Sequence, residues 1–403
     1  MTVTARRIWD LLVSLLLIMS VSCYQSGSRV VRLAENVWRK AAQDHQHRIK
    51  ELLLPGLTAP SDPLNSGHRR NPKAFLDGWT ALDPKHPIYN FLIEYYGLKG
   101  AKGTRRLARW SPGPRGVNES ILLEGACEED FGSILHLRGA IMEEDGIMYS
   151  PFEFFGKGNP EKREDAARAA TPYLWYRSIL QNTAQAEPIL HCHGLHEWAM
   201  QYQPPGAPPP PSAKYQGHLP LRVDQQVINE AVERKGVSCT HVDALRYFAP
   251  AAGPLNHHGF KLERIDQLRL EQPACVHAHM DLLKILLRLQ PFCEAELLQR
   301  VLEIALKARR LDVAASPYDV SSYGVDTVAV ESKNGRAQYR TEQLALMKAA
   351  APVREDLLKA YDIFLEAAFD ADALVLANSS PQPERYAQAE PGGKPWRKNL
   401  VTS

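Results

Sequence analysis

The sequence predicts a mainly α-helical fold, with one large helical domain and a few short strands or loops in the 111–165 region. Apolar residues make up 44% of the 403 residues, which is enough to build a packed core. Several long segments place apolar residues three and four positions apart, the spacing of an amphipathic helix. Short apolar runs broken by Gly, Pro and acidic residues fall within 111–165, so we expect the strands there.

Composition suggests how the chain is divided. Residues 1–30 are interpreted as a targeting segment, 31–375 as the helical domain and 376–403 as a disordered tail, because the tail is polar and rich in Pro and Gly. Two stretches rich in Pro, Ser or Gly are expected to be loop insertions, near 58–84 and 203–220.

The N-terminus resembles a signal peptide. Arg6 and Arg7 precede an apolar run from Leu11 to Val21, which is too short to span a bilayer but suits a signal-peptide core. We expect targeting to the secretory pathway or an organelle; a membrane-anchored start, or a cytoplasmic protein with a misassigned start codon, is the alternative. No later segment is long and apolar enough to predict a transmembrane span in the mature chain.

The helices are predicted from apolar periodicity and from their end signals. The first ends at Pro55-Gly56, and Thr171 with Pro172 is a typical helix start, with Thr as N-cap and Pro at the first helical position. The last segment is expected to form one long helix or two shorter ones. The predicted helices span 33–54, 88–96, 171–185, 223–235, 241–248, 274–289, 294–311 and 338–371, and the predicted strands or loops lie at 121–123 and 147–155.

Charge gives little support for DNA as a partner. Lys plus Arg is 48 and Asp plus Glu is 46, whereas proteins held to nucleic acid by phosphate contacts usually carry a clear basic excess. A small-molecule substrate is therefore an equally open expectation. Two local basic groups are interpreted as solvated helix faces. They are Arg105, Arg106 and Arg109, and Lys307, Arg309 and Arg310.

The cysteines predict buried free thiols. The chain has six, and none forms a CxxC pair, which argues against a zinc ribbon or a disulfide-dense scaffold.

Histidines mark the candidate site. Nine of the fourteen lie between His191 and His279, and imidazole is the side chain best suited to metal ligation and to proton transfer near neutral pH. A divalent Fe, Mn or Zn ion is one expectation, and a metal-free acid–base pocket is the other. The candidate catalytic residues are His196, Glu197, His241, Asp243, His277 and Asp281, and the candidate metal ligands are His196, His241, His277 and Asp281.

The first motif is HCHGLHEWAMQY, residues 191–202. His193 and Glu197 share a face if a helix begins early enough, whereas His196 points about 100° away from Glu197. The motif is not the HExxH zinc pattern. A hydrogen-bonded core histidine is the alternative for His196, and Trp198 is a candidate substrate-binding residue.

The second motif is THVDALRYFAPAAGPLN, residues 240–256. Thr240 and Asp243 have the spacing of a capping box, which would explain Asp243 structurally. Arg246 and Tyr247 supply a cation and an aromatic face, and both are candidate substrate-binding residues.

The third motif is LEQPACVHAHMDLLK, residues 270–284. His277 and Asp281 lie one helical turn apart. The carboxylate can therefore hold the imidazole in one tautomer, or the two side chains can bind the same metal ion. Two polar side chains in an apolar helix are costly to bury without partners, which favours a functional or networked role. His279 points elsewhere and is expected to be exposed.

The fourth motif is LDVAASPYDV, residues 311–320. Asp312 closes a helix and Ser316-Pro317 begins a turn. Tyr318 and Asp319 are candidate substrate-binding residues if the turn faces a pocket. A simple helix stop and turn is the alternative.

These motifs, together with HPIYNFLIEYYG and RRLARW, resemble a bacterial family common in actinobacteria and known as 3-methyladenine DNA glycosylases. The resemblance covers roughly residues 35–365. It implies removal of alkylated bases from DNA, with the flipped base stacked between aromatic rings. The available rings are Tyr95, Tyr96, Trp198, Tyr247 and Phe248.

The same resemblance implies that Asp243 or Asp281 stabilises the developing positive charge on the sugar, and that Arg105, Arg106 and Arg109 contact phosphates. The chain lacks a helix-hairpin-helix signature, because Thr58 stands where the motif after Leu54 requires a second Gly. No catalytic residue is carried over from the family.

Three hypotheses follow. A DNA glycosylase is the activity that the resemblance implies. A metal-dependent enzyme with a small-molecule substrate is the activity that the histidines and carboxylates suggest. A non-catalytic binding protein, in which the polar motifs form a buried network, is the third.

Overall fold

The computed structural model describes residues 29–57, 79–113, 116–117, 119–210 and 217–379. Most of the predicted 376–403 tail, nearly all of the predicted targeting segment and most of the predicted insertion near 58–84 lie outside these residues. Residues 376–379 are helical, so the prediction of a disordered tail is wrong for them. Within them the chain is mainly helical and carries one small sheet, which confirms the predicted fold class. No described helix is both long and apolar enough to cross a membrane.

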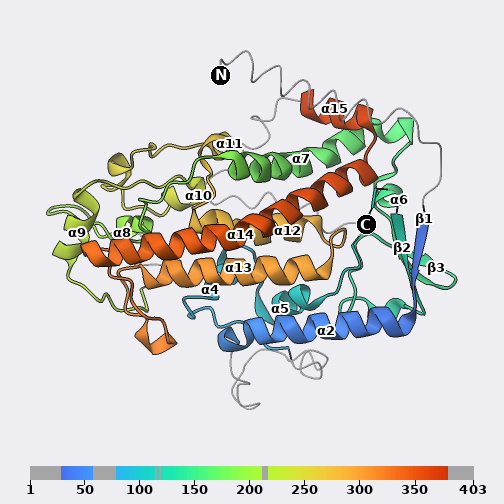
Figure 1. Cartoon of the computed structure of the whole chain (residues 1–403), viewed down its shortest axis with the longest axis horizontal. Helices are drawn as coiled ribbons and strands as arrows, with labels where there is room; N and C mark the ends of the chain where they lie inside the picture. The colour runs from blue at the N-terminus through green and yellow to red at the C-terminus, as the bar shows by residue number, and fades with distance from the viewer. Residues whose placement is uncertain (1–28, 58–78, 114–115, 118, 211–216, 380–403) are drawn as a thin grey trace.

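Long helices form the body of the molecule and run roughly along its length (Figure 1). They are α2 (Glu35–Leu53), α7 (Arg163–Gln185), α12 (Val276–Leu289), α13 (Ala295–Ala314) and α14 (Lys333–Ala368). Helix α12 packs against α7, α13 and α14, and eleven of its fourteen residues are buried. It is therefore the central helix, and most of its residues, including the polar His279 and Asp281, are held inside the protein.

The apolar periodicity explains these helices. Helix α13 buries Leu298, Val301, Leu302 and Ala305 at three- and four-residue spacing, the stripe that faces a core. Helix α14 begins at Ser332, whose hydroxyl accepts a hydrogen bond from the amide of Gly335, as an N-cap does. Of the two outcomes expected for this segment, the single long helix is observed.

The sheet has the strand order β1-β2-β4-β3. The strands are β1 (Arg29–Leu33), β2 (Glu119–Glu124), β3 (Ala140–Glu143) and β4 (Gly146–Tyr149). Strand β1 pairs with β2 in parallel, and the other two pairs are antiparallel. Strand β1 was not predicted, because its residues continue the basic stretch that was assigned to targeting. Trp38 of α2 and the inner side chains of β2 and β4 form a second, smaller apolar cluster.

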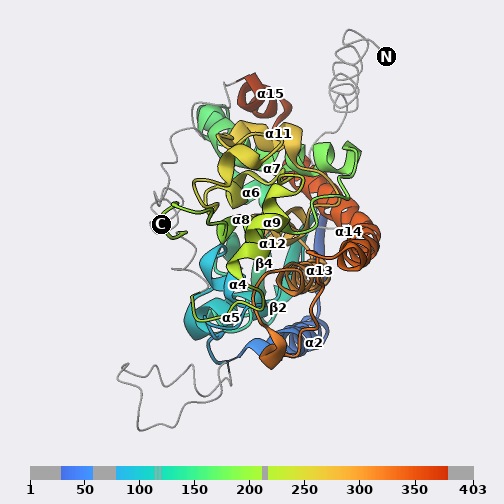
Figure 2. The same ribbon diagram turned by 90° about the vertical axis from the view of Figure 1, so that its left-hand side faces the viewer.

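Shorter helices complete the fold, and α8 and α9 lie at the end of the long helices that faces the viewer in Figure 2. The short helices are α4 (Asn90–Glu94), α5 (Gly100–Ala108), α6 (Pro151–Phe155), α8 (Leu195–Met200), α9 (Gln225–Glu233), α10 (Val242–Leu245), α11 (Gln267–Leu270) and α15 (Ala371–Ser379).

Several predicted element boundaries are wrong, and α14 begins at Lys333 rather than at 338. Helix α7 begins at Arg163, so Pro172 lies inside it rather than at its start. Proline has no amide hydrogen to donate to the preceding turn, yet the burial of Tyr173 and Leu174 on the same helix keeps the segment helical. Another error is the segment from 147, which leaves the sheet at Tyr149, because Ser150 caps helix α6 and Pro151 occupies its first position.

Candidate metal centre

Three histidines from separate elements meet inside the protein. His196 lies on α8, His241 immediately precedes α10, and His277 lies on the first turn of α12. The ring of His277 stands between the other two, 4.4 Å from the ring centre of His196 and 4.7 Å from that of His241, on which it is stacked. The structure thus brings together the three imidazoles that the sequence analysis selected.

An inner group consists of His196, His277 and Asp312. One ring nitrogen of each histidine and one carboxylate oxygen all lie within 4.8 Å of one another. His196 Nε2 and Asp312 Oδ1 are 2.7 Å apart. Both atoms are buried, and the contact pairs the imidazole with the carboxylate.

Arg309 holds the other oxygen of the same carboxylate. Its Nη1 lies 2.6 Å from Asp312 Oδ2 and 3.1 Å from Oε1 of Glu197, and its Nε donates to the carbonyl of Pro87. The Arg309 side chain is only about 5% exposed, so its predicted place on a solvated helix face is wrong. It faces inward because two buried carboxylates require a cation.

The charges of the inner group are coupled. Burial alone would lower the pKa of His196, but the Asp312 carboxylate outweighs it and the pKa is raised. Burial would raise the pKa of Asp312, whereas His196 and Arg309 hold it well below its usual range. For His277, desolvation and the two neighbouring imidazoles all lower the pKa, so its ring stays neutral near pH 7. A neutral imidazole is the form that binds a metal ion.

An outer group consists of His241, Asp243 and Asp281, whose donor atoms also lie within 4.8 Å of one another. Both carboxylate oxygens of Asp243 accept hydrogen bonds from Arg264, Oδ2 at 2.9 Å and Oδ1 at 2.6 Å. Asp243 also forms an ion pair with Arg246. These ion pairs occupy Asp243 with cations, which makes it a poorer metal ligand than Asp312.

The predicted capping box at Asp243 is not formed. The N-cap of α10 is His241, without a side-chain cap bond, and Asp243 turns instead to the guanidinium of Arg264. Burial raises the pKa of Asp243, but Lys284 and Arg264 outweigh this and hold it well below its usual range. The stronger pull of two cations explains why the carboxylate is not used as a cap.

Asp281 belongs to the outer group and not to the group of His277, although the two lie one turn apart on α12. Its Oδ1 accepts a hydrogen bond from the hydroxyl of Tyr96 at 3.3 Å, and its Oδ2 lies 3.4 Å from Nζ of Lys284. The four predicted metal ligands are therefore divided between two groups, His196 and His277 in one and His241 and Asp281 in the other.

Glu271, at the end of α11, was missed by the sequence analysis. Its Oε2 lies 3.9 Å from Nδ1 of His241 and accepts a hydrogen bond from the side chain of Gln267. Burial and the nearby Asp281 carboxylate raise its pKa to about 7. Gln267 and Glu271 are four residues apart, and that helical pair of polar residues beside the third motif was the available signal.

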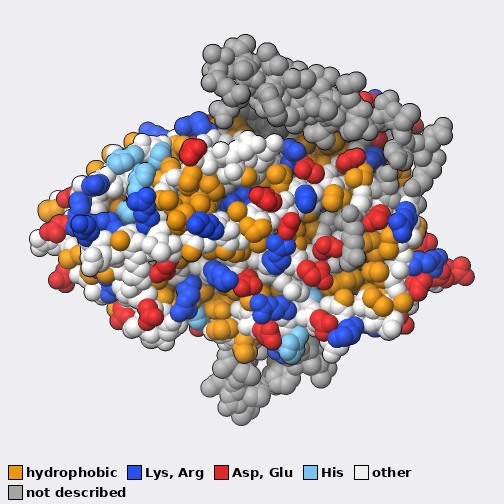
Figure 3. All heavy atoms as spheres, in the orientation of Figure 1, with side chains coloured by type: hydrophobic (Ala, Val, Ile, Leu, Met, Phe, Trp, Pro, Cys, Tyr) orange, Lys and Arg blue, Asp and Glu red, His pale blue; other side chains and the backbone are white. Residues whose placement is uncertain are grey.

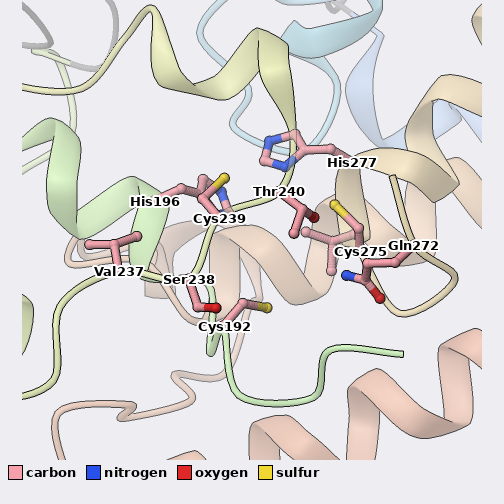
Figure 4. Close-up of a pocket in the computed structure, with 10 residues that line it drawn as sticks. Cys192, His196, Val237, Ser238, Cys239, Thr240, Gln272, Cys275 and His277 are labelled. Atoms are coloured by element: carbon pink, nitrogen blue, oxygen red, sulfur yellow. The ribbon is translucent and has the colours of Figure 1, made fainter. Parts of the chain in front are cut away.

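A small cavity of about 20 Å³ adjoins the inner group, and this is room for roughly one water molecule. His196 and His277 both line it, and Figure 4 shows how the lining side chains surround it. The other lining residues are Cys192, Val237, Ser238, Cys239, Thr240, Gln272, Cys275 and Val276.

The predicted substrate-binding residues are not all accessible. Trp198 is fully buried and donates its Nε1 hydrogen to the carbonyl of Ala315. Tyr318 is buried against Gln201, while Asp319 is exposed and accepts hydrogen bonds from Ser321 in a turn. Arg246 and Tyr247 retain partly exposed side chains beside the outer group. The helix stop and turn is therefore the better interpretation of the fourth motif.

Other expectations for individual residues are also corrected. His279 is fully buried, with Arg354 3.2 Å from its Nδ1, because α12 is covered on nearly every side. His193 lies in the turn before α8 with a positive φ of 50°, so it does not share a helix face with Glu197. Among the described cysteines, Cys127 is exposed rather than buried.

Comparisons with protein-family models, with curated proteins and with solved structures found no match for this chain.

Proposed function

We propose that the chain is a metal-dependent enzyme that binds one divalent transition-metal ion through His196, His277 and Asp312. The observation that carries the proposal is the 2.7 Å contact between His196 Nε2 and Asp312 Oδ1, two buried atoms that lie within 4.8 Å of a ring nitrogen of His277. Two lone-pair atoms at this distance require a proton or a cation between them. A divalent ion held by His196, His277 and Asp312 would supply that cation.

The donor set supports the same conclusion. Two imidazoles and one carboxylate are typical ligands of catalytic zinc and of non-haem iron, and three protein ligands leave a coordination position open. Arg309 donates a hydrogen bond to Oδ2 of Asp312 and so orients this carboxylate. Carboxylates that bind a metal ion are usually oriented by such a hydrogen bond. Zn, Fe or Mn are the ions that suit such a site.

The reaction that this arrangement supports best is hydrolysis of a small polar substrate. A bound ion of this kind supplies a Lewis acid and a water molecule that loses its proton near pH 7. His241 stacks on His277, and burial lowers its pKa, so it is neutral and able to accept that proton. In such a hydrolysis the oxygen of water would bond to the substrate carbon or phosphorus, and His241 would return the proton to the leaving group.

DNA glycosylase activity is the second candidate, and one observation favours it. The rings of Tyr95 and Tyr247 stand edge to face at 6.0 Å beside the outer group, and the guanidinium of Arg246 lies 5.6 Å from the ring of Tyr247. Both tyrosines are at least partly exposed, so they could stack on a flipped base. This candidate ranks lower because Trp198 and Phe248 are buried.

Two further observations weigh against DNA binding. Basic and acidic side chains are interspersed on the face shown in Figure 3, without a basic stripe. Two of the three arginines expected to contact phosphates instead bond to backbone carbonyls of the protein, Arg106 to that of Leu287 and Arg109 to that of Gly132.

The test compares the protein stripped of metal with the protein reloaded with Zn²⁺, Mn²⁺ or Fe²⁺. Hydrolysis is measured on a panel of phosphoesters, amides and lactones, and base release is measured on alkylated duplex DNA. We expect hydrolysis only after reloading, and none in Asp312→Asn, whereas the exposed control Asp319→Asn retains it. Base release that is independent of metal would favour the glycosylase, and inactivity on every substrate with no metal uptake would leave a structural network.

A further inference from the structure

A second pair of imidazoles contacts Ser238, a residue that lines the same cavity. Ser238 Oγ lies 3.3 Å from Nε2 of His191 and 3.1 Å from Nε2 of His258. Ser238 is buried and lines the cavity together with His196 and His277. His191 is exposed and His258 is half-buried, so both rings are accessible from solvent while they contact a cavity-lining residue. Histidine side chains also gather on the protein surface at the end of the molecule where α8 and α9 lie (Figure 3).

Thiols line the space between the two sets of imidazoles. Cys192, Cys239 and Cys275 come from three separate segments, and their sulfur atoms are seen around the cavity in Figure 4. Among the described residues, no three cysteine and histidine donors here are close enough to hold an ion permanently. Such a lining suits passage of an ion better than storage.

The outer group gives a cation a less favourable approach. Lys284, Arg264 and Arg246 are all partly exposed there, and they form ion pairs with the carboxylates Asp243 and Asp281, while the third carboxyl nearby, Glu271, is buried. This excess of positive charge repels a metal ion and attracts an anionic group. The metal and the substrate therefore have different routes to the centre.

We infer that His191, Ser238 and His258 form an uptake site for a divalent transition-metal ion, which passes through the thiol-lined cavity to His196, His277 and Asp312. The inference rests on the proposed function. Imidazoles at the surface replace the first water ligands of the ion, and the inner imidazoles and carboxylate replace the rest. Nitrogen and sulfur donors also favour Zn²⁺ or Fe²⁺ over Mg²⁺ and Ca²⁺ along this route.

The experiment follows the loading of Co²⁺ into the full-length metal-free protein by stopped-flow absorbance. The double variant His191→Ala, His258→Ala is expected to load about tenfold more slowly, equivalent to roughly 1.4 kcal/mol in the activation free energy. Its final metal content and equilibrium affinity should match those of the wild type, because the inner ligands are intact. The matched control is His257→Ala, which removes an exposed neighbouring imidazole that is not a partner of Ser238.

The outcomes separate the inference from the proposed function. If the wild type binds Co²⁺, His196→Ala does not, and the double variant loads at the wild-type rate, the uptake site is refuted and the metal centre stands. If the wild type binds no Co²⁺, both are refuted. Thermal unfolding without metal shows whether the surface variants fold, and we expect unchanged midpoints because both histidines lie at the protein surface.

Discussion

Replacing Glu271 with Gln should stabilise the protein above pH 7. The folded protein holds the proton of Glu271 up to a pKa of about 7, whereas the ordinary value is 4.5. Protonated Glu271 contributes its full amount to the free energy of unfolding below about pH 4.5, and this contribution is lost as the pH rises through about 7. The amide side chain introduced by Glu271→Gln would stay neutral throughout and would therefore avoid the loss.

The magnitude follows from the two pKa values. A difference between about 7 and 4.5 corresponds to roughly 3 kcal/mol, at about 1.36 kcal/mol per pH unit. In Glu271→Gln, the amide oxygen can still accept the hydrogen bond from Gln267, so packing is conserved. The cause of the shift is burial, and Glu271 is only 4% exposed.

The assay is urea unfolding of the metal-free protein at pH 5 and at pH 8, with the exposed control Glu342→Gln in parallel. Glu271→Gln should gain stability over the wild type between the two pH values, and Glu342→Gln should not. Equal pH dependence of the wild type and Glu271→Gln would refute the assignment of Glu271 as a buried carboxyl that is protonated in the folded state.

Three other predictions concern the same site. Asp312→Asn should lower the free energy of unfolding by about 3 kcal/mol, because it removes the buried anion that pairs with both His196 and Arg309 and leaves Arg309 only Glu197. It should also abolish stabilisation by Zn²⁺ in thermal unfolding, and unchanged stability would contradict the inner group. The pKa values of His277 and His279 are lowered in the folded protein, so below pH 6.5 these side chains bind protons in the unfolded chain but not in the folded one. The free energy of unfolding of the metal-free protein should therefore fall as the pH drops from 6.5 to 5. A rise of this free energy in calorimetric or urea measurements would rule this out. Tyr96→Phe should cost about 1–2 kcal/mol in urea unfolding through the lost hydrogen bond to Asp281, and a neutral result would show that this contact is unimportant.

The sequence predicted the helices well because apolar spacing determines them directly. Helices α2, α12 and α13 begin and end within about three residues of the predicted limits, and their stripes of Leu, Ile, Val and Ala are the buried faces. Helix α7 was mispredicted because local end signals such as Thr171-Pro172 were outweighed by packing of the surrounding residues. A local sequence pattern cannot predict packing between segments that are distant in the sequence.

The site was predicted only in part, for a similar reason. The meeting of His196, His241 and His277 was expected from the density of histidines and from the cost of burying polar groups on α12. Asp312 was predicted to end a helix, and Arg309 was predicted to lie on a solvated helix face. Charged side chains three residues apart on a helix usually face water. Only the contact with α8 shows that this pair faces inward.

The most direct test of the metal centre is the metal content of protein purified without added metal or chelator, measured by inductively coupled plasma mass spectrometry. We predict about one Zn, Fe or Mn ion per chain in the wild type and in the control Asp319→Asn, and none in His277→Ala or Asp312→Asn. A wild type without metal that also takes up none from added Zn²⁺ would contradict the account.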